Sequence, residues 1–150
     1  MWRCEFLPTR VAIGADDRSV LTDAVRDALR ERGYELIAFG AIEQGPQPWP
    51  QVGRAVGEAV ASGRAQCGVV MCWTATGVTI AANKVRGVRA ALCSDAQTAA
   101  GARRWNDANV LAISMRATSI PVALEILDAW FATGMSDDPA DRRAIEELKE

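Results

Sequence analysis

A cysteine stands at the junction of an apolar segment and a helix-forming segment. Cys72 ends the apolar run 67–72, a short polar turn follows, and an alanine-rich stretch begins at Gly77. If the run is a strand, a thiol lies at its C-terminal end, where the first N–H groups of the next helix have no partners within that helix. Such a position favours a thiolate and stabilises a developing oxyanion. The alternative is a buried cysteine that only completes a core strand.

Histidine is absent from the sequence, so imidazole is excluded as a base, an acid or a metal ligand in this chain. The cysteines are Cys4, Cys67, Cys72 and Cys93, and they form no Cys-x-x-Cys pair. A zinc site is therefore not expected. Cys67 and Cys72 fall on one expected strand and point to opposite faces, which places them badly for a disulfide. We expect reduced thiols, no metal and no cofactor.

The composition is that of an ordinary globular protein. The 150 residues, 49% hydrophobic and 24% charged, fit one domain over 1–150. A net charge of −2 gives no basic surface for nucleic acid. No apolar stretch reaches the length of a membrane span, and residues 1–8 lack the apolar core of a signal peptide. We expect a cytoplasmic protein that binds neither nucleic acid nor a membrane.

Strand and helix patterns alternate along the chain. Strands are expected at 11–15, 34–39, 67–72, 88–92 and 109–113. Helices are expected at 20–33, 51–62, from 77 to about 85, and at 95–104, 120–131 and 140–150, with Ser19 and Ser94 as N-caps of the first and fourth. This alternation indicates an α/β fold with a parallel, doubly wound sheet of five strands.

The last expected helix, 140–150, follows a break rich in glycine and proline. It is charged, and its apolar residues Ile145 and Leu148 share one face. Because so few apolar residues hold it to its own chain, we expect this helix to pack on a neighbouring subunit. A frayed tail is the alternative.

Several short blocks form a recognisable pattern: Val11–Asp16, Cys72-x-Thr74-x-x-Gly77, Ile80–Lys84, Gly87–Cys93 and Asn106–Ala112. Over about residues 11 to 133 this pattern resembles type B ribose-5-phosphate isomerases, a family that includes the galactose-6-phosphate isomerase subunits. The resemblance implies a Rossmann-like three-layer subunit that forms a homodimer or a tetramer, with the active site between two subunits. It also implies interconversion of aldose and ketose phosphates through an enediolate.

The resemblance assigns roles to individual residues. Cys72 falls on the catalytic thiol, a base that moves a proton between adjacent carbons. Thr74 falls on the hydroxyl that moves protons between the two sugar oxygens, and N–H groups of residues 73–77 are candidate donors to the enediolate. Asp16 and Asn106 fall on sugar-hydroxyl contacts, with a turn residue and a helix terminus as the structural alternatives. The candidate substrate-binding residues are Asp16, Asp17, Trp73, Ala75, Gly77, Trp105, Asn106, Arg116 and Arg143.

The sequence departs from the family pattern where the family has histidine and glycine. The usual Asp-His after the first strand is Asp16-Asp17, and the usual His-Asn-Asp is Trp105-Asn106-Asp107. The turn usually written Cys-Gly-Thr-Gly is Cys72-Trp73-Thr74-Ala75, so an indole and a methyl replace two glycines that allow close approach of the backbone.

Further departures concern phosphate binding and aromatic residues. Arg116 matches the phosphate-contacting arginine of the family, but the C-terminal arginines have only Arg142 or Arg143 as approximate counterparts. Trp49 stands where the family usually has tyrosine. Fewer cationic groups and more indole rings near the pocket mouth favour an apolar, planar or non-phosphorylated ligand.

Two functions remain open from the sequence. The first is a divergent aldose–ketose isomerase for a sugar phosphate or a non-phosphorylated sugar, with Cys72 as base and Thr74 as relay. The second is a non-catalytic subunit, or one that depends on a paralogous subunit, whose pocket is filled by indole. We expect weak or undetectable isomerisation of ribose 5-phosphate, because the acid that assists ring opening is absent.

Overall fold

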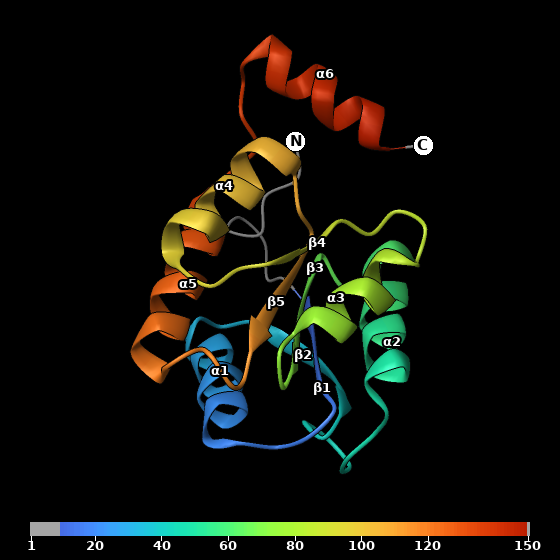
Figure 1. The fold of residues 1–150 in the computed structure, drawn as a ribbon, viewed down its shortest axis with the longest axis vertical. Helices are drawn as coiled ribbons and strands as arrows, with labels where there is room; N and C mark the ends of the chain where they lie inside the picture. Colours follow the sequence, from blue (N-terminus) through green and yellow to red (C-terminus); the bar gives the residue numbers. More distant parts are fainter. Residues whose placement is uncertain (1–9, 150) are drawn as a thin grey trace.

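The computed structural model describes residues 10–149, so Cys4 and the segment 1–8 lie outside the described residues (Figure 1). The elements alternate along the chain, with a helix pair at the end. They are β1 (Arg10–Ala15), α1 (Val20–Glu31), β2 (Glu35–Gly40), α2 (Trp49–Ala61), β3 (Cys67–Cys72), α3 (Thr76–Asn83), β4 (Ala90–Leu92), α4 (Ala96–Asn106), β5 (Val110–Ser114), α5 (Ile120–Ala132) and α6 (Pro139–Leu148). No helix among the described residues is long and apolar enough to cross a membrane.

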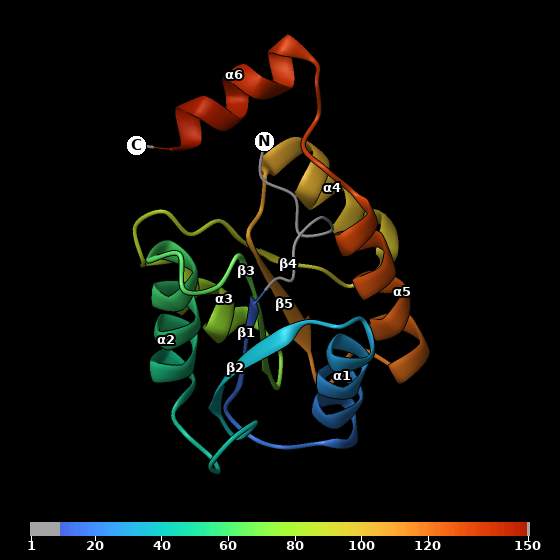
Figure 2. The same ribbon diagram turned by 180° about the vertical axis from the view of Figure 1, so that it is seen from behind.

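The five strands form one parallel sheet in the order β2-β1-β3-β5-β4. Helices α1, α4 and α5 cover one face of the sheet, and α2 and α3 cover the other (Figures 1 and 2). The doubly wound three-layer fold expected from the sequence is therefore confirmed. The winding reverses between β1 and β3, and in open α/β sheets the crevice beyond the C-terminal ends of such strands is where ligands bind.

The core lies in two parts, one on each face of the sheet. All residues of β3 are buried, as its continuous apolar run predicts. Cys67 belongs to the apolar cluster beneath α1, α4 and α5, whereas Cys72 belongs to the cluster beneath α2 and α3. The two thiols thus point to opposite faces, as expected from strand alternation.

Some boundaries differ from the sequence expectation. The N-cap of α4 is Asp95 rather than Ser94, because the Asp95 carboxylate accepts the N–H of Thr98 at 2.7 Å. Strand β4 begins two residues later than expected, since the Arg89 N–H is bonded to the Asn109 side chain at 2.7 Å instead of a strand carbonyl. Helix α2 begins at Trp49, two residues early, with proline in its tolerant first turn.

Helix α6 lies beyond α4 at the end of the molecule opposite α1 (Figures 1 and 2). Asp138 caps it by accepting the N–H of Ala140 at 2.8 Å, and the Ser136 N–H donates to the Arg104 carbonyl at 2.9 Å. Ile145 is only 2% exposed, so this apolar residue is covered within its own chain, whereas Leu148 is 57% exposed. The helix is therefore attached to its own subunit by half of its apolar face.

Candidate active site

Three polar side chains lie in a row at the C-terminal ends of the central strands. Ala15 pairs with Met71 and Cys72 pairs with Ser114, so Asp16 stands beside Cys72, one residue beyond the β1–β3 ladder. Strand alternation places Asp16, Cys72 and Ser114 on the face that α2 and α3 cover. The thiol, the carboxylate and the hydroxyl therefore share one face of the sheet at its C-terminal end.

The Asp16 carboxylate is prepared to accept a ligand hydrogen bond. Its Oδ1 is buried and has no hydrogen-bond partner among residues 10–149. Burial raises the pKa of Asp16, opposed in part by the N–H groups of Asp16 and Asp17, which favour the charged form. An acceptor buried without a donor costs free energy that a ligand hydroxyl would recover. No three Cys, Asp or Glu side chains within residues 10–149 come close enough to hold a metal ion.

The turn between β3 and α3 is fixed through its carbonyl groups. The Cys72 carbonyl accepts the Met115 N–H at 3.0 Å, and the Trp73 carbonyl accepts the Arg116 N–H and the Ser114 hydroxyl, both at 2.9 Å. In a planar trans peptide the N–H points opposite to the carbonyl, so the Thr74 N–H is directed away from β5. Together with the first N–H groups of α3, this arrangement supplies donors at the position expected for the enediolate.

Ser114 was not among the residues singled out from the sequence. It is 8% exposed, its hydroxyl donates to the Trp73 carbonyl at 2.9 Å and it accepts the Ala117 N–H at 3.1 Å. The sequence pattern that could have indicated Ser114 is a polar residue at the end of an apolar strand, as for Cys72, with which it pairs. Ser114 holds the turn in place rather than facing a ligand.

Ala75 occupies a backbone conformation that glycine adopts more readily. It is the N-cap of α3 with φ 65° and ψ −5°, and its methyl group is fully buried. The left-handed region costs a residue with a Cβ atom about 1–2 kcal/mol. The turn therefore holds an alanine in a conformation that glycine adopts at no steric cost, and the methyl group packs into the core cluster beneath α2 and α3.

The indole rings are arranged differently from the expectation of a filled pocket. Trp73 is 62% exposed, so it projects into solvent. Trp49 lies against Gly77, where a Cβ atom would come within 2.8 Å of the ring. Trp49 thus forms a wall beside the first turn of α3, and Gly77 is required there for contact with the indole rather than with a ligand.

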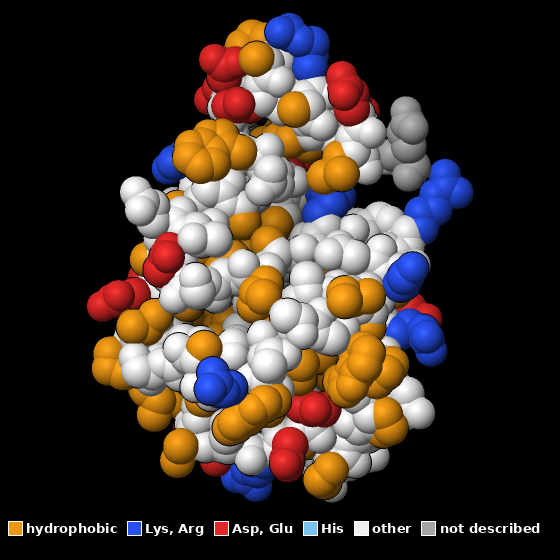
Figure 3. Space-filling view, viewed as in Figure 1, with side chains coloured by type: hydrophobic (Ala, Val, Ile, Leu, Met, Phe, Trp, Pro, Cys, Tyr) orange, Lys and Arg blue, Asp and Glu red, His pale blue; other side chains and the backbone are white. Residues whose placement is uncertain are grey.

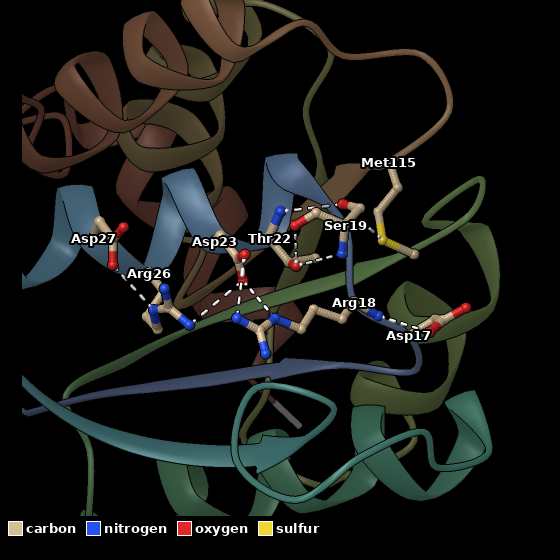
Figure 4. A network of polar contacts seen from close by, with 8 residues as sticks. All are labelled: Asp17, Arg18, Ser19, Thr22, Asp23, Arg26, Asp27 and Met115. Atoms are coloured by element: carbon tan, nitrogen blue, oxygen red, sulfur yellow. Dashed lines mark hydrogen bonds and ion pairs between the residues drawn. The ribbon is translucent and has the colours of Figure 1, made fainter.

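The loop after β1 is held by a network of polar contacts (Figure 4). The Asp17 carboxylate accepts the N–H of Arg18 at 2.8 Å, and the Arg18 guanidinium turns toward α1, where Nε lies 2.9 Å from Asp23 Oδ1. Ser19 and Thr22 form a capping box, and the Ser19 hydroxyl lies 3.7 Å from Met115 Sδ. The charge of Arg18 is therefore paired on α1, while Asp17 stays exposed at the same end of the sheet as Cys72.

The remaining candidate residues are not brought together with Cys72 in one chain. Trp105 and Asn106 end α4 and Arg143 lies on α6, at the opposite end of the sheet. The length of β5, about 13 Å at the rise of a strand, separates this end from Cys72. Trp105 and Cys72 are therefore far apart within a single chain, and the expectation that Trp105 lies at the mouth of a site formed between two subunits stays a prediction. Trp105 is 54% exposed and covers Gly101 on its own helix.

Asn106 lines a separate cleft of about 730 Å³ below α6 (Figure 3). The cleft lies at the end of the sheet where the strands begin. Its other polar lining residues are Asn83, Arg86, Arg89 and Lys149. A smaller cavity of about 470 Å³ adjoins it and shares Arg89. The candidate residues thus fall into two groups at opposite ends of the sheet, one around Cys72 and one around Asn106.

The end of α4 is rigidly held next to this cleft. Asp107 accepts hydrogen bonds from Arg89, at 2.8 Å through its carbonyl and at 3.2 Å through its carboxylate. The buried Arg103 lies 3.7 Å from the same carboxylate and stacks over Trp130. These contacts fix the left-handed Asp107 and with it the position of Asn106.

The chain is similar to known sugar-phosphate isomerases over most of its length. Residues 11–148 match the family model described as Ribose/Galactose Isomerase. The chain is 36% identical to D-erythrulose-4-phosphate isomerase of Pectobacterium atrosepticum, with 80% of each protein covered. It is 37% identical to ribose-5-phosphate isomerase B of Escherichia coli, over 81% of this chain and 82% of that protein. The structure of Clostridium thermocellum ribose-5-phosphate isomerase B superposes with a TM-score of 0.86 at 36% identity, covering 93% and 95% of the two chains.

Proposed function

Because this chain belongs to the ribose/galactose isomerase family, we propose that it is a divergent aldose–ketose isomerase. The observation that carries the proposal is the juxtaposition of Cys72, Asp16 and the N–H donors of the 73–76 turn at the reversal between β1 and β3. This arrangement offers a proton acceptor, a hydroxyl acceptor and oxyanion donors in one crevice. Enediolate chemistry requires each of these groups.

In the proposed reaction, the Cys72 thiolate takes the proton from C2 of an open-chain aldose and returns it to C1. Thr74 gives its hydroxyl proton to O1 and takes the proton of O2, so that the protein ends in its starting state. The N–H groups of the turn stabilise the negative charge on the enediolate oxygens. The Asp16 carboxylate accepts a hydrogen bond from another substrate hydroxyl.

We place the complete site between two copies of the chain. Asn106, Trp105 and Arg143 cannot reach Cys72 of their own subunit, but a second copy could present them to it. The exposed apolar side chains of Ile80 on α3 and Leu92 on the edge strand β4, 59% and 39% exposed, support a contact between copies on this face. The active form would then be a homodimer with two equivalent shared sites.

The substrate that fits best is a short sugar phosphate that stays open-chain. Opening a five-carbon sugar ring needs an acid or base that titrates near neutral pH, and this chain contains no histidine. A four-carbon sugar phosphorylated at O4 has no free hydroxyl that could close a five-membered ring. The relative that is named D-erythrulose-4-phosphate isomerase supports this substrate class.

The test compares two substrates by NMR in D₂O. Isomerisation and deuterium incorporation at C1 and C2 are followed for D-erythrulose 4-phosphate and for ribose 5-phosphate, with Cys72→Ala as the control. We expect turnover of the four-carbon substrate, much weaker turnover of ribose 5-phosphate, and no exchange in Cys72→Ala. If the wild-type protein exchanges no carbon-bound proton with either substrate, the non-catalytic or partner-dependent subunit is the correct function.

A further inference from the structure

A second hydroxyl lies in contact with the one that relays protons in the proposed reaction. Thr74 Oγ1 and Thr76 Oγ1 are 2.8 Å apart, and either oxygen can be the donor. Thr76 is the first residue of α3 and, like Thr74, is exposed at the crevice end of the sheet. Thr76 had no role in the sequence pattern that pointed to Cys72 and Thr74.

This contact is not part of the ordinary capping of the helix. The N-cap of α3 is Ala75, and no side chain caps the helix there. The next threonine of the helix differs, since Thr79 Oγ1 donates to the Ala75 carbonyl at 2.6 Å. The hydroxyl of Thr79 is therefore used by the backbone, while the hydroxyl of Thr76 is directed at Thr74.

We infer that Thr76 is a positioning residue for the proton relay, an inference that rests on the proposed isomerase function. The backbone of the turn is already fixed by the bonds to the carbonyls of Trp73 and Ala75. The rotation of the Thr74 hydroxyl is then the remaining freedom at the relay. A hydrogen bond from Thr76 removes that freedom and leaves the Thr74 proton directed toward the substrate.

The count of donors and acceptors agrees with this role. A hydroxyl has one proton and two lone pairs. During the relay, Thr74 gives its proton to O1 of the substrate and accepts the proton of O2 on one lone pair, and Thr76 donates to the other lone pair. Thr76 keeps its own proton throughout, so the proton balance closes on Thr74 and the substrate. Its bond is strongest while the Thr74 oxygen carries excess negative charge.

The inference is tested by kinetics with two substitutions at one position. Thr76→Val keeps the shape and removes the hydroxyl, and Thr76→Ser restores it. We expect Thr76→Val to lower kcat by about three- to tenfold, as for loss of one hydrogen bond, with little change in KM, and Thr76→Ser to restore kcat. Thr133→Val is the control, because Thr133 is the C-cap of α5 and its hydroxyl donates to the Ala129 carbonyl at 2.7 Å, away from the β3–α3 turn.

A double-mutant cycle separates positioning from a general structural effect. If Thr76 acts through Thr74, Thr76→Val has no further effect on kcat once Thr74→Val is present. An equal effect in both backgrounds, or a kcat of Thr76→Val equal to that of the wild type, overturns the inference while leaving the isomerase function in place. A wild-type protein without turnover overturns both.

Discussion

The indole of Trp49 lies directly on Gly77, so that two of its ring carbons would be 2.8 Å from a Cβ atom at that position. The contact joins the first turn of α2 to the first turn of α3, beside the N–H groups that are proposed to hold the enediolate. Real Cβ contacts this short do not occur. The absence of a side chain at Gly77 therefore determines where the Trp49 ring can lie.

Gly77→Ala is expected to displace the Trp49 ring and to lower the free energy of unfolding by about 1–3 kcal/mol, the usual cost of overpacking. Urea unfolding measures this effect. Gly134→Ala is the matched control, because nothing lies within 4 Å of a Cβ atom there and its φ is not positive. In a Trp49→Ala background, Gly77→Ala should instead stabilise the protein by up to about 1 kcal/mol through helix propensity. Destabilisation by Gly77→Ala in both backgrounds would show that the indole is not the cause.

The charged carboxylate of Asp16 is expected to lower the free energy of unfolding at neutral pH, because it is partly buried. Burial raises the pKa of Asp16 in the folded protein, so the folded state binds more protons than the unfolded state between the two pKa values. Stability contributed by this group is therefore lost as the pH rises through its folded pKa. Asp16→Asn should be at least as stable as the wild type at pH 7. Its relative advantage should shrink as the pH falls from the raised pKa of Asp16 to the ordinary pKa of a carboxyl group, because below that value Asp16 is protonated in both the folded and the unfolded state.

The same substitution should reduce activity, since the carboxylate is proposed to accept a substrate hydroxyl. A hydrogen bond to a charged group corresponds to about a ten- to hundredfold change in kcat/KM. Urea unfolding at several pH values and steady-state kinetics measure the two effects. Asp27→Asn is the control, because Asp27 is exposed on α1, where it pairs with Arg26, and has no role in the proposed site. A destabilised Asp16→Asn with full activity would assign Asp16 to the fold alone.

The fold could be predicted from local patterns because each element carries its own boundary signals. The apolar run 67–72 became β3 with the expected bounds, and Ser19 caps α1 through the expected side chain. Errors arose where two polar residues compete for one role. Asp95 rather than Ser94 accepts the Thr98 N–H. The side chain of Asn109 accepts the N–H of Arg89, so that Arg89 is not part of the strand expected at 88–92. Such choices depend on tertiary geometry that neighbouring sequence does not contain.

The candidate site was predictable only where residues follow strands directly. Asp16, Cys72 and Arg116 lie at the same end of the sheet because parallel strands end there. A helix terminus was the structural alternative for Asn106, and α4 does end at this residue, at the opposite end of the sheet from Cys72. The role of Ser114 was also hidden, since it depends on the register between β3 and β5. The left-handed Ala75 could not be read from its residue type, because alanine rarely adopts that conformation.

Among the described cysteines, Cys72 is expected to react first with iodoacetamide near neutral pH. Cys67 and Cys93 have no exposed surface, and burial raises the pKa of the Cys93 thiol to about 12. Cys72 is 5% exposed and ends β3 at the turn that leads into α3, so its thiol is the only one of these three with accessible surface. Because Cys93 is as fully buried as Cys67, both are expected to be labelled slowly. Mass-spectrometric peptide mapping separates these sites from Cys4, and faster labelling of Cys93 than of Cys72 would contradict a reactive thiol in the crevice.

The last prediction tests the shared site through complementation. Cys72→Ala removes the base from one end of the sheet, and Asn106→Ala removes the amide from the other end, so each homodimer alone should be inactive or strongly impaired. When the two variants are mixed and allowed to exchange subunits, half of the dimers become mixed, and each mixed dimer holds one site with both residues intact. Recovery should approach about a quarter of the wild-type activity. A mixture of Thr133→Val, which keeps both residues of the site, with Cys72→Ala is the control. It gives the activity expected when an inactive variant exchanges subunits with an active one. A mixture that stays as inactive as its two components, although subunit exchange is demonstrated by mass spectrometry, would show that Cys72 and Asn106 do not serve one site.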